Sequence, residues 1–289
     1  MTTLQEYYEQ ALLSRAGYAL DLEVGDRGLS TYMESYRLKL VSSGLTETQA
    51  EQFINRYTIL SSQENTASGF AATIFQDNET GKIIFSMRGT EPRLISPVVI
   101  DLATDFGDIG ADGIAISQSI DLFNYYQNLT SFKDDVVRQY QYIDYREEWG
   151  INGLIKVPVA PYITYTESIA TEDGVLAFDE SFNVVGHSLG GHLALAMQRL
   201  AADNVNAVYT FNAPGFDFAG AEPGSDVFYQ LLYDAEVIAN GTSSVNTVGY
   251  NTNIITNFVV PGDVVSEVGT VPGGGSIRSL FGATKRRPA

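Results

Sequence analysis

The second half of the chain alternates short apolar stretches with helical ones, and this alternation restricts the possible folds more than any other feature. Three segments have strand character: FNVV (182–185), AVYTF (207–211) and NIITNFVV (253–260). Helical patterns lie between them, GGHLALAMQRLAA at 190–202 and DVFYQLLYDAEVIA at 226–239. Apolar strands that alternate with helices indicate a parallel sheet covered on both faces. We therefore expect an α/β fold with a mostly parallel sheet and helices on both faces.

The first sixty residues are predicted to be helical. In LQEYYEQALLSRAGYAL, which begins at Leu4, apolar residues recur every three or four positions and Gly17 follows near the end of the pattern. In LTETQAEQFINRY, Thr46 and Gln49 match a capping box, and the apolar stripe that follows ends at Tyr57. Both segments are typical of helices that pack against each other.

A β-hairpin is predicted between residues 70 and 87. The stretches FAATIFQD and KIIFSM are rich in β-branched and aromatic residues and flank a polar turn at 78–81. The second stretch leads directly into Arg88-Gly89-Thr90. Another helix is expected at 115–129, whereas residues 130–178 have a mixed pattern.

The charge balance argues against nucleic acid as a partner. The chain has 17 Lys+Arg and 35 Asp+Glu, a net charge of −18, and its first cationic cluster is at 285–287. The absence of cysteine excludes disulfides, thiolate catalysis and Cys-ligated zinc, and two histidines leave little material for a metal site.

No membrane-spanning segment is predicted. No apolar run approaches the roughly 18–20 residues that a bilayer span needs, and the N-terminus lacks the basic and apolar parts of a signal peptide. The localisation stays open between the cytoplasm and secretion without an N-terminal signal peptide.

The length and composition fit a globular chain. With 289 residues, 44% hydrophobic and 18% charged, it has room for one large domain or two small ones. We expect an α/β domain over residues 1–272 that includes the N-terminal helical segment 1–60. A tail that is glycine-rich and then basic is expected at 273–289.

The most specific motif is Gly186-His187-Ser188-Leu189-Gly190-Gly191, which we call the elbow. It lies between an apolar strand and a helical pattern, the context in which Gly-x-Ser-x-Gly presents a serine hydroxyl on a strained turn above a sheet. Side chains at 186 and 190 are expected to collide across so sharp a turn. The helix N-terminus and the amide of Leu189 favour a developing oxyanion. An ordinary strand-to-helix turn that contains a serine is the alternative.

With these motifs in order, the sequence resembles the class 3 lipase family of α/β-hydrolases. The resemblance spans about residues 70–270, and within the family it is similar to the catalytic domain of bacterial secreted lipases. The segments that carry it are SMRGT (86–90), DLATDFGD (101–108), VVGHSLGGHLALA (184–196), VYTFNAPGF (208–216) and NFVVPGDVVSEVG (257–269).

The resemblance implies a carboxylic ester hydrolase of triacylglycerol lipase or phospholipase type. By that resemblance Ser188 is the nucleophile, Asp263 the acid, and Thr90 and Leu189 the oxyanion hole. Asp263 is also a candidate acid independently of the resemblance, because it follows an apolar strand and is therefore expected at the carboxyl edge of the sheet. Asp217 and Asp226 are weaker rivals.

The general base is the point at which the sequence departs from the family. The family's histidine follows the acid, yet no histidine follows His192 here. At an elbow the side chain of His187 points away from the hydroxyl, and His192 is expected to be structural. Two interpretations remain: a chain that stops before the histidine, which we favour, or a pseudoenzyme that keeps the fold for binding. Either predicts little or no turnover from residues 1–289.

The substrate is expected to be a lipid or another small ester, with contact at a lipid–water interface. Residues 149–165 and 92–100 could cover an acyl groove, although an ordinary packed insertion is the alternative. A serine peptidase or thioesterase would share the same motif.

No cofactor is expected. Three aspartates among glycines could offer ligands to calcium, although closely spaced acids are more often solvated surface; they are Asp105, Asp108 and Asp112.

Overall fold

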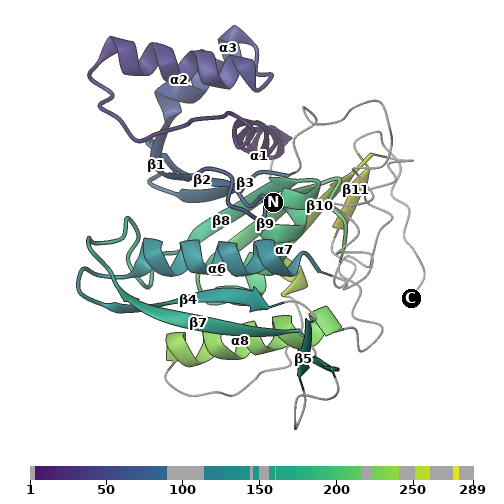
Figure 1. The fold of residues 1–289 in the computed structure, drawn as a ribbon. Helices are drawn as coiled ribbons and strands as arrows, with labels where there is room; N and C mark the ends of the chain where they lie inside the picture. The colour runs from purple at the N-terminus through teal and green to yellow at the C-terminus, as the bar shows by residue number, and fades with distance from the viewer. Residues whose placement is uncertain are drawn as a thin grey trace.

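The computed structural model describes residues 4–89, 114–143, 146–149, 156–159, 161–215, 223–240, 251–260 and 276–279. Within these residues one seven-stranded sheet has the order β1-β2-β3-β8-β9-β10-β11 (Figure 1). The strands are β1 (Tyr57–Gln63), β2 (Ala72–Asp77), β3 (Ile83–Met87), β8 (Phe182–His187), β9 (Val205–Phe211), β10 (Ile255–Val259) and β11 (Ser276–Ser279). Pairing is antiparallel from β1 to β3 and parallel from β3 to β11.

Helices cover both faces of the sheet, which confirms the predicted α/β-hydrolase type of fold. Figure 1 shows α1 on one side and α6, α7 and α8 on the other. The helices are α1 (Leu4–Ala16), α2 (Ser30–Ser42), α3 (Glu47–Arg56), α6 (Ile116–Thr130), α7 (Leu189–Leu200) and α8 (Pro223–Asn240), and a short 3-10 helix η3 (Thr252–Ile254) precedes β10. A mostly parallel sheet with this cover positions the elbow between β8 and α7.

Two buried clusters explain why the central strands have apolar residues at successive positions. In β8, Val184 belongs to the cluster under α6 and α7, whereas its neighbour Val185 belongs to the cluster under α1. Phe85 and Ile84 of β3 divide in the same way. Because successive strand residues face opposite sides, a sheet covered on both faces favours apolar residues at successive positions.

α1 and α3 begin and end close to the predicted positions, but the prediction that the first sixty residues are helical was wrong at two places. Residues 17–29 form turns and a loop between α1 and α2. Thr46 and Gln49 form the capping box through both reciprocal hydrogen bonds. However, the helical prediction ran to residue 60, and the structure turns into β1 at Tyr57, which has φ −111 and ψ 134. Tyr57 pairs with Asp77, so residues 57–60 gain a neighbouring strand that a helix would have lacked.

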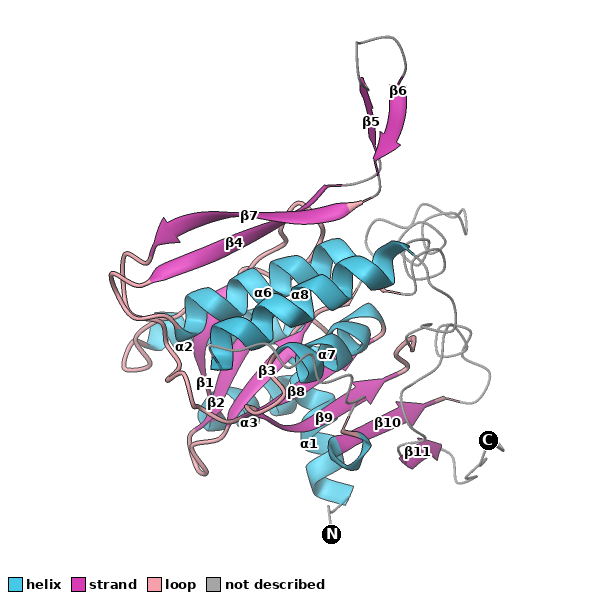
Figure 2. Ribbon diagram, turned by 90° about the horizontal axis from the view of Figure 1, so that it is seen from below, coloured by secondary structure: helices cyan, strands magenta, loops and turns pink. Residues whose placement is uncertain are grey.

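The mixed stretch 130–178 forms two antiparallel ribbons. β4 (Val136–Ile143) pairs with β7 (Tyr162–Ile169), and β5 (Arg146–Trp149) pairs with β6 (Lys156–Val159). Figure 2 shows the β4–β7 ribbon across α6 and α8, with the β5–β6 ribbon projecting beyond it. Part of the segment 149–165, which could cover an acyl groove according to the sequence, therefore forms β-strands.

Several predictions fall at the margins of the described residues. The other candidate cover, 92–100, lies outside them. β11 lies within 273–289, the segment predicted to be a tail, and pairs with β10. The domain boundaries themselves stay a prediction.

Candidate active site

Ser188 adopts the strained backbone expected of a nucleophile at a strand-to-helix turn. Its φ of 55 and ψ of −130 lie in a region that residues with a Cβ rarely occupy. β8 ends at His187 and α7 begins at Leu189, so the serine is the single residue between strand and helix. Its side chain does not cap the helix. The hydroxyl therefore does not bond to the first-turn amides. The Gly191 N–H donates to the Ser188 carbonyl at 2.9 Å, whereas the N–H of Leu189, the first residue of α7, has no acceptor within the helix.

The glycines of the elbow are required by backbone contacts. A Cβ on Gly186 would overlap the carbonyl of Gly190, as the sequence suggested. A Cβ on Gly190 would instead overlap the carbonyl oxygen of Met87, at the end of β3. The second glycine thus allows α7 to start directly against the neighbouring strand.

The carboxyl ends of β8, β9 and β10 are joined by hydrogen bonds at the elbow. The Ser188 N–H donates to the Phe211 carbonyl at 2.9 Å, and the Asn212 N–H donates to the Phe258 carbonyl at 2.8 Å. The side-chain oxygen of Asn212 accepts from the Val260 N–H at 2.8 Å. Asn212 has a positive φ of 47, a conformation that asparagine tolerates better than most residues.

These hydrogen bonds fix the backbone that leads to the predicted acid. Val260 is three positions before Asp263, and Asp263 lies outside the described residues. Of its rivals, Asp217 also lies outside them, and Asp226 belongs to α8. Asn212 was missed from the sequence, where an Asn directly after an apolar strand was the only signal.

The oxyanion loop is described up to the residue before Thr90. A Cβ on Gly89 would lie 2.5 Å from the His187 carbonyl oxygen and 3.2 Å from the Gly190 nitrogen. The backbone that leads into Thr90 therefore lies against the elbow, although Thr90 itself is outside the described residues. Leu189 begins α7, so its N–H has no acceptor within the helix.

Tyr18, which follows α1, also contacts the elbow, although the two are distant in the sequence. Its hydroxyl lies 3.0 Å from Nδ1 of His187, and the two rings meet edge to face at 5.9 Å. The same hydroxyl lies 2.6 Å from where a Cβ on Gly89 would be. Tyr18 therefore contacts both the elbow and the oxyanion loop, a role that no sequence pattern indicated.

His192 is a buried structural residue. Its side chain is fully buried, and its Nε2 accepts a hydrogen bond from the Ala115 N–H at 3.2 Å. Desolvation lowers the pKa of His192 to about 4, against the opposing effect of hydrogen bonding to the backbone of Pro214 and Gly215. A neutral ring that holds α7 to the start of α6 does not suit a general base.

The described residues offer neither a metal cluster nor a membrane span. No group of three or more His, Cys, Asp or Glu side chains among them could hold a metal ion. The three aspartates proposed for calcium lie outside this part of the chain. In the same described residues no helix combines the length and hydrophobicity that crossing a bilayer requires.

Comparison with known proteins gives only distant structural likeness. No protein-family model and no curated protein matches the chain. Solved structures with some similarity include Lip2 lipase from Yarrowia lipolytica, at 15% identity and TM-score 0.39, over 92% of this chain and 74% of that one. Lipase II from Rhizopus niveus has 12% identity and TM-score 0.36, over 91% and 74%.

A triacylglycerol lipase whose catalytic centre is described as a serine protease triad has 13% identity and TM-score 0.35, over 91% of this chain and 74% of that one. Similarity this low carries no argument about activity.

Proposed function

We propose that the chain is a serine hydrolase of lipase or esterase type that cleaves carboxylic ester bonds through an acyl-enzyme on Ser188. The observation that carries the proposal is the strained Ser188 backbone between β8 and α7. This geometry presents the hydroxyl beside first-turn amides, where the negative charge of a tetrahedral intermediate would form. The N–H groups of Leu189 and Thr90 are proposed as its donors.

In the proposed reaction Ser188 attacks the ester carbonyl, and the alcohol leaves as the acyl-enzyme forms. Water then attacks the acyl group, releases the acid and restores the serine. Asp263 is proposed to orient the base, because the chain reaches it from β10, which is tied through Asn212 to the strand beside the elbow. The proposed substrates are lipid esters of triacylglycerol or phospholipid type, as for the bacterial secreted lipases that the motifs resemble.

Neither histidine of the sequence suits the role of base. His192 is fully buried and accepts from Ala115, and Nδ1 of His187 is engaged by Tyr18. A test of Ser188 is therefore cleanest when an external base is added. Imidazole is a small molecule that can serve as that base.

The experiment measures hydrolysis of p-nitrophenyl butyrate with increasing imidazole. The folded chain should show a protein-dependent rate that rises with imidazole above the rate of imidazole alone. Ser188→Ala should abolish that excess, and Ser181→Ala should keep it, because Ser181 is an exposed serine just before β8. An equal excess in Ser188→Ala, or none in the unsubstituted chain, would favour the non-catalytic binding module.

A further inference from the structure

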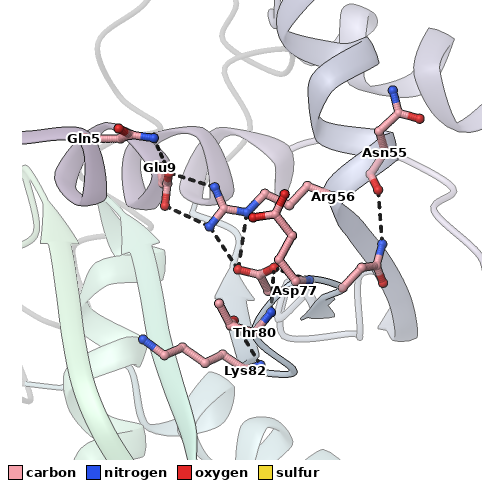
Figure 3. A network of polar contacts seen from close by, with 9 residues as sticks. Gln5, Glu9, Asn55, Arg56, Asp77, Thr80 and Lys82 are labelled. Carbon is pink, nitrogen blue, oxygen red and sulfur yellow. Dashed lines mark hydrogen bonds and ion pairs between the residues drawn. The ribbon is translucent and has the colours of Figure 1, made fainter.

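A partly buried ion-pair network lies at the end of the sheet opposite the elbow. Arg56, the last residue of α3, bonds to both Glu9 of α1 and Asp77 of β2, with shortest distances of 2.7 and 3.0 Å. Figure 3 shows the guanidinium between the two carboxylates and the Lys82 side chain extending away from it. The two carboxylates share one cation, so the network keeps a net negative charge.

A cavity of about 260 Å³ borders this network. Besides the three residues of the network, α1 contributes Glu6, Gln10 and Leu13 to its lining. Lys82, Ile84 and Asn183 line it from the amino ends of β3 and β8. Ser188 follows the carboxyl end of β8, so the cavity is separate from the candidate active site.

Gln10 gives evidence for a bound ligand that is independent of the ion pairs. Its side chain is 7% exposed, and its Oε1 has no hydrogen-bond partner among the described residues. A buried carbonyl oxygen without a donor is costly, and native proteins rarely leave one. An acceptor of this kind on a cavity wall indicates a ligand that brings its own donor.

The charged side chains that line the cavity indicate which kind of hydrogen-bond donor a ligand would bring. The side chains charged at neutral pH are three acids, Glu6, Glu9 and Asp77, and two bases, Arg56 and Lys82, which gives 2 − 3 = −1. Glu6 accepts a hydrogen bond from Tyr209 at 3.4 Å, and an ionised carboxylate has about four acceptor sites on its two oxygens. A cationic donor therefore matches this wall better than a neutral one.

We propose that this cavity binds a small molecule through a primary ammonium group, which donates to Oε1 of Gln10 and is held by the nearby carboxylate of Glu6. The volume corresponds to about eight or nine waters at roughly 30 Å³ each, which admits a free amino acid or a short diamine. Leu13 and Ile84 give an apolar surface for its hydrocarbon part. Exposed Lys82 would pair with the carboxylate of an amino acid, which a diamine lacks.

Isothermal titration of the full chain tests the proposal. The probes are glycine, L-leucine, L-glutamine and putrescine, with N-acetyl-L-leucine as the matched compound without an ammonium group. At least one of the four amines should bind, and N-acetyl-L-leucine should not. Gln10→Leu should weaken binding by about tenfold or more, because it removes the acceptor of a charge-assisted bond. The substitution should fold, since it replaces a side chain whose buried Oε1 has no hydrogen-bond partner among the described residues with an apolar one of similar size.

The Lys82→Met variant distinguishes an amino acid from a diamine as the ligand that carries the ammonium group. Weaker binding of an amino acid with unchanged binding of putrescine indicates an amino-acid site, whereas putrescine binding alone indicates a diamine site. Lys133→Met is the matched control, because Lys133 is an exposed lysine far from the lining in sequence and not part of it. The proposal is overturned if none of the four amines binds. It is also overturned if N-acetyl-L-leucine binds equally well or if Gln10→Leu leaves the affinity unchanged.

Discussion

His192 should make the stability of the protein depend on pH in a way that one substitution can isolate. The ring is fully buried, and desolvation lowers its pKa from 6.5 to about 4. In the unfolded chain the ring takes up its proton near pH 6.5, whereas the folded protein resists protonation until about pH 4. Protonation therefore favours the unfolded chain, and the resulting loss of stability begins near pH 6.5 and is complete once the pH falls below about 4.

The pKa values set the size of the effect. A pKa difference of 6.5 − 4 = 2.5 corresponds to about 3.4 kcal/mol once the pH is below both values. At pH 5 the folded ring is still mostly neutral and the unfolded ring mostly charged, so about 2 kcal/mol is already lost. Above pH 7.5 the contribution is close to zero.

Urea unfolding of the parent chain and His192→Gln between pH 5 and 8 measures this difference. Glutamine can accept from the Ala115 N–H but does not titrate, and every other titrating group is common to both proteins. The free energy of unfolding of the parent should fall by about 2 kcal/mol more than that of the variant between pH 8 and 5. Parallel pH profiles would refute the burial of a neutral His192.

Three further substitutions test the described contacts. Gly190→Ala places a methyl group on the Met87 carbonyl, so the free energy of unfolding should fall by about 1–3 kcal/mol; an unchanged melting temperature would contradict the close approach. Tyr18→Phe removes the hydroxyl bonded to His187 and should cost about 0.5–1.5 kcal/mol in urea unfolding. No loss would show that this bond does not hold the N-terminal segment to the elbow. Thr46→Ala removes the helix cap and should cost about 1 kcal/mol, whereas a stability equal to the parent's would refute the capping box.

Local patterns predicted the elements that place Ser188. The strand-turn-helix unit could be predicted because its signals all lie within about twenty residues: the apolar strand, the two glycines and the helical spacing after them. The capping box at Thr46 was equally local. β1 was missed because Tyr57 fits the helical spacing of the residues before it, and only its pairing with Asp77 identifies it as a strand.

Contacts between distant segments could not be predicted. Tyr18 and His187 are 169 positions apart, and nothing in either neighbourhood indicates that they meet. The bond from Val260 to Asn212 likewise depends on the order of the strands in the sheet. The cavity beside Arg56 depends on α1, α3 and β2 meeting at one edge, which follows from tertiary packing alone.

The most direct test of the central claim is covalent labelling of Ser188. The folded chain is treated with a fluorophosphonate in the presence of imidazole, digested, and mapped by mass spectrometry. A single adduct on Ser188, absent after denaturation in urea and absent from Ser188→Ala, is the predicted result. Labelling spread equally over other serines, or none on Ser188, would contradict the claim that the elbow presents an activated nucleophile.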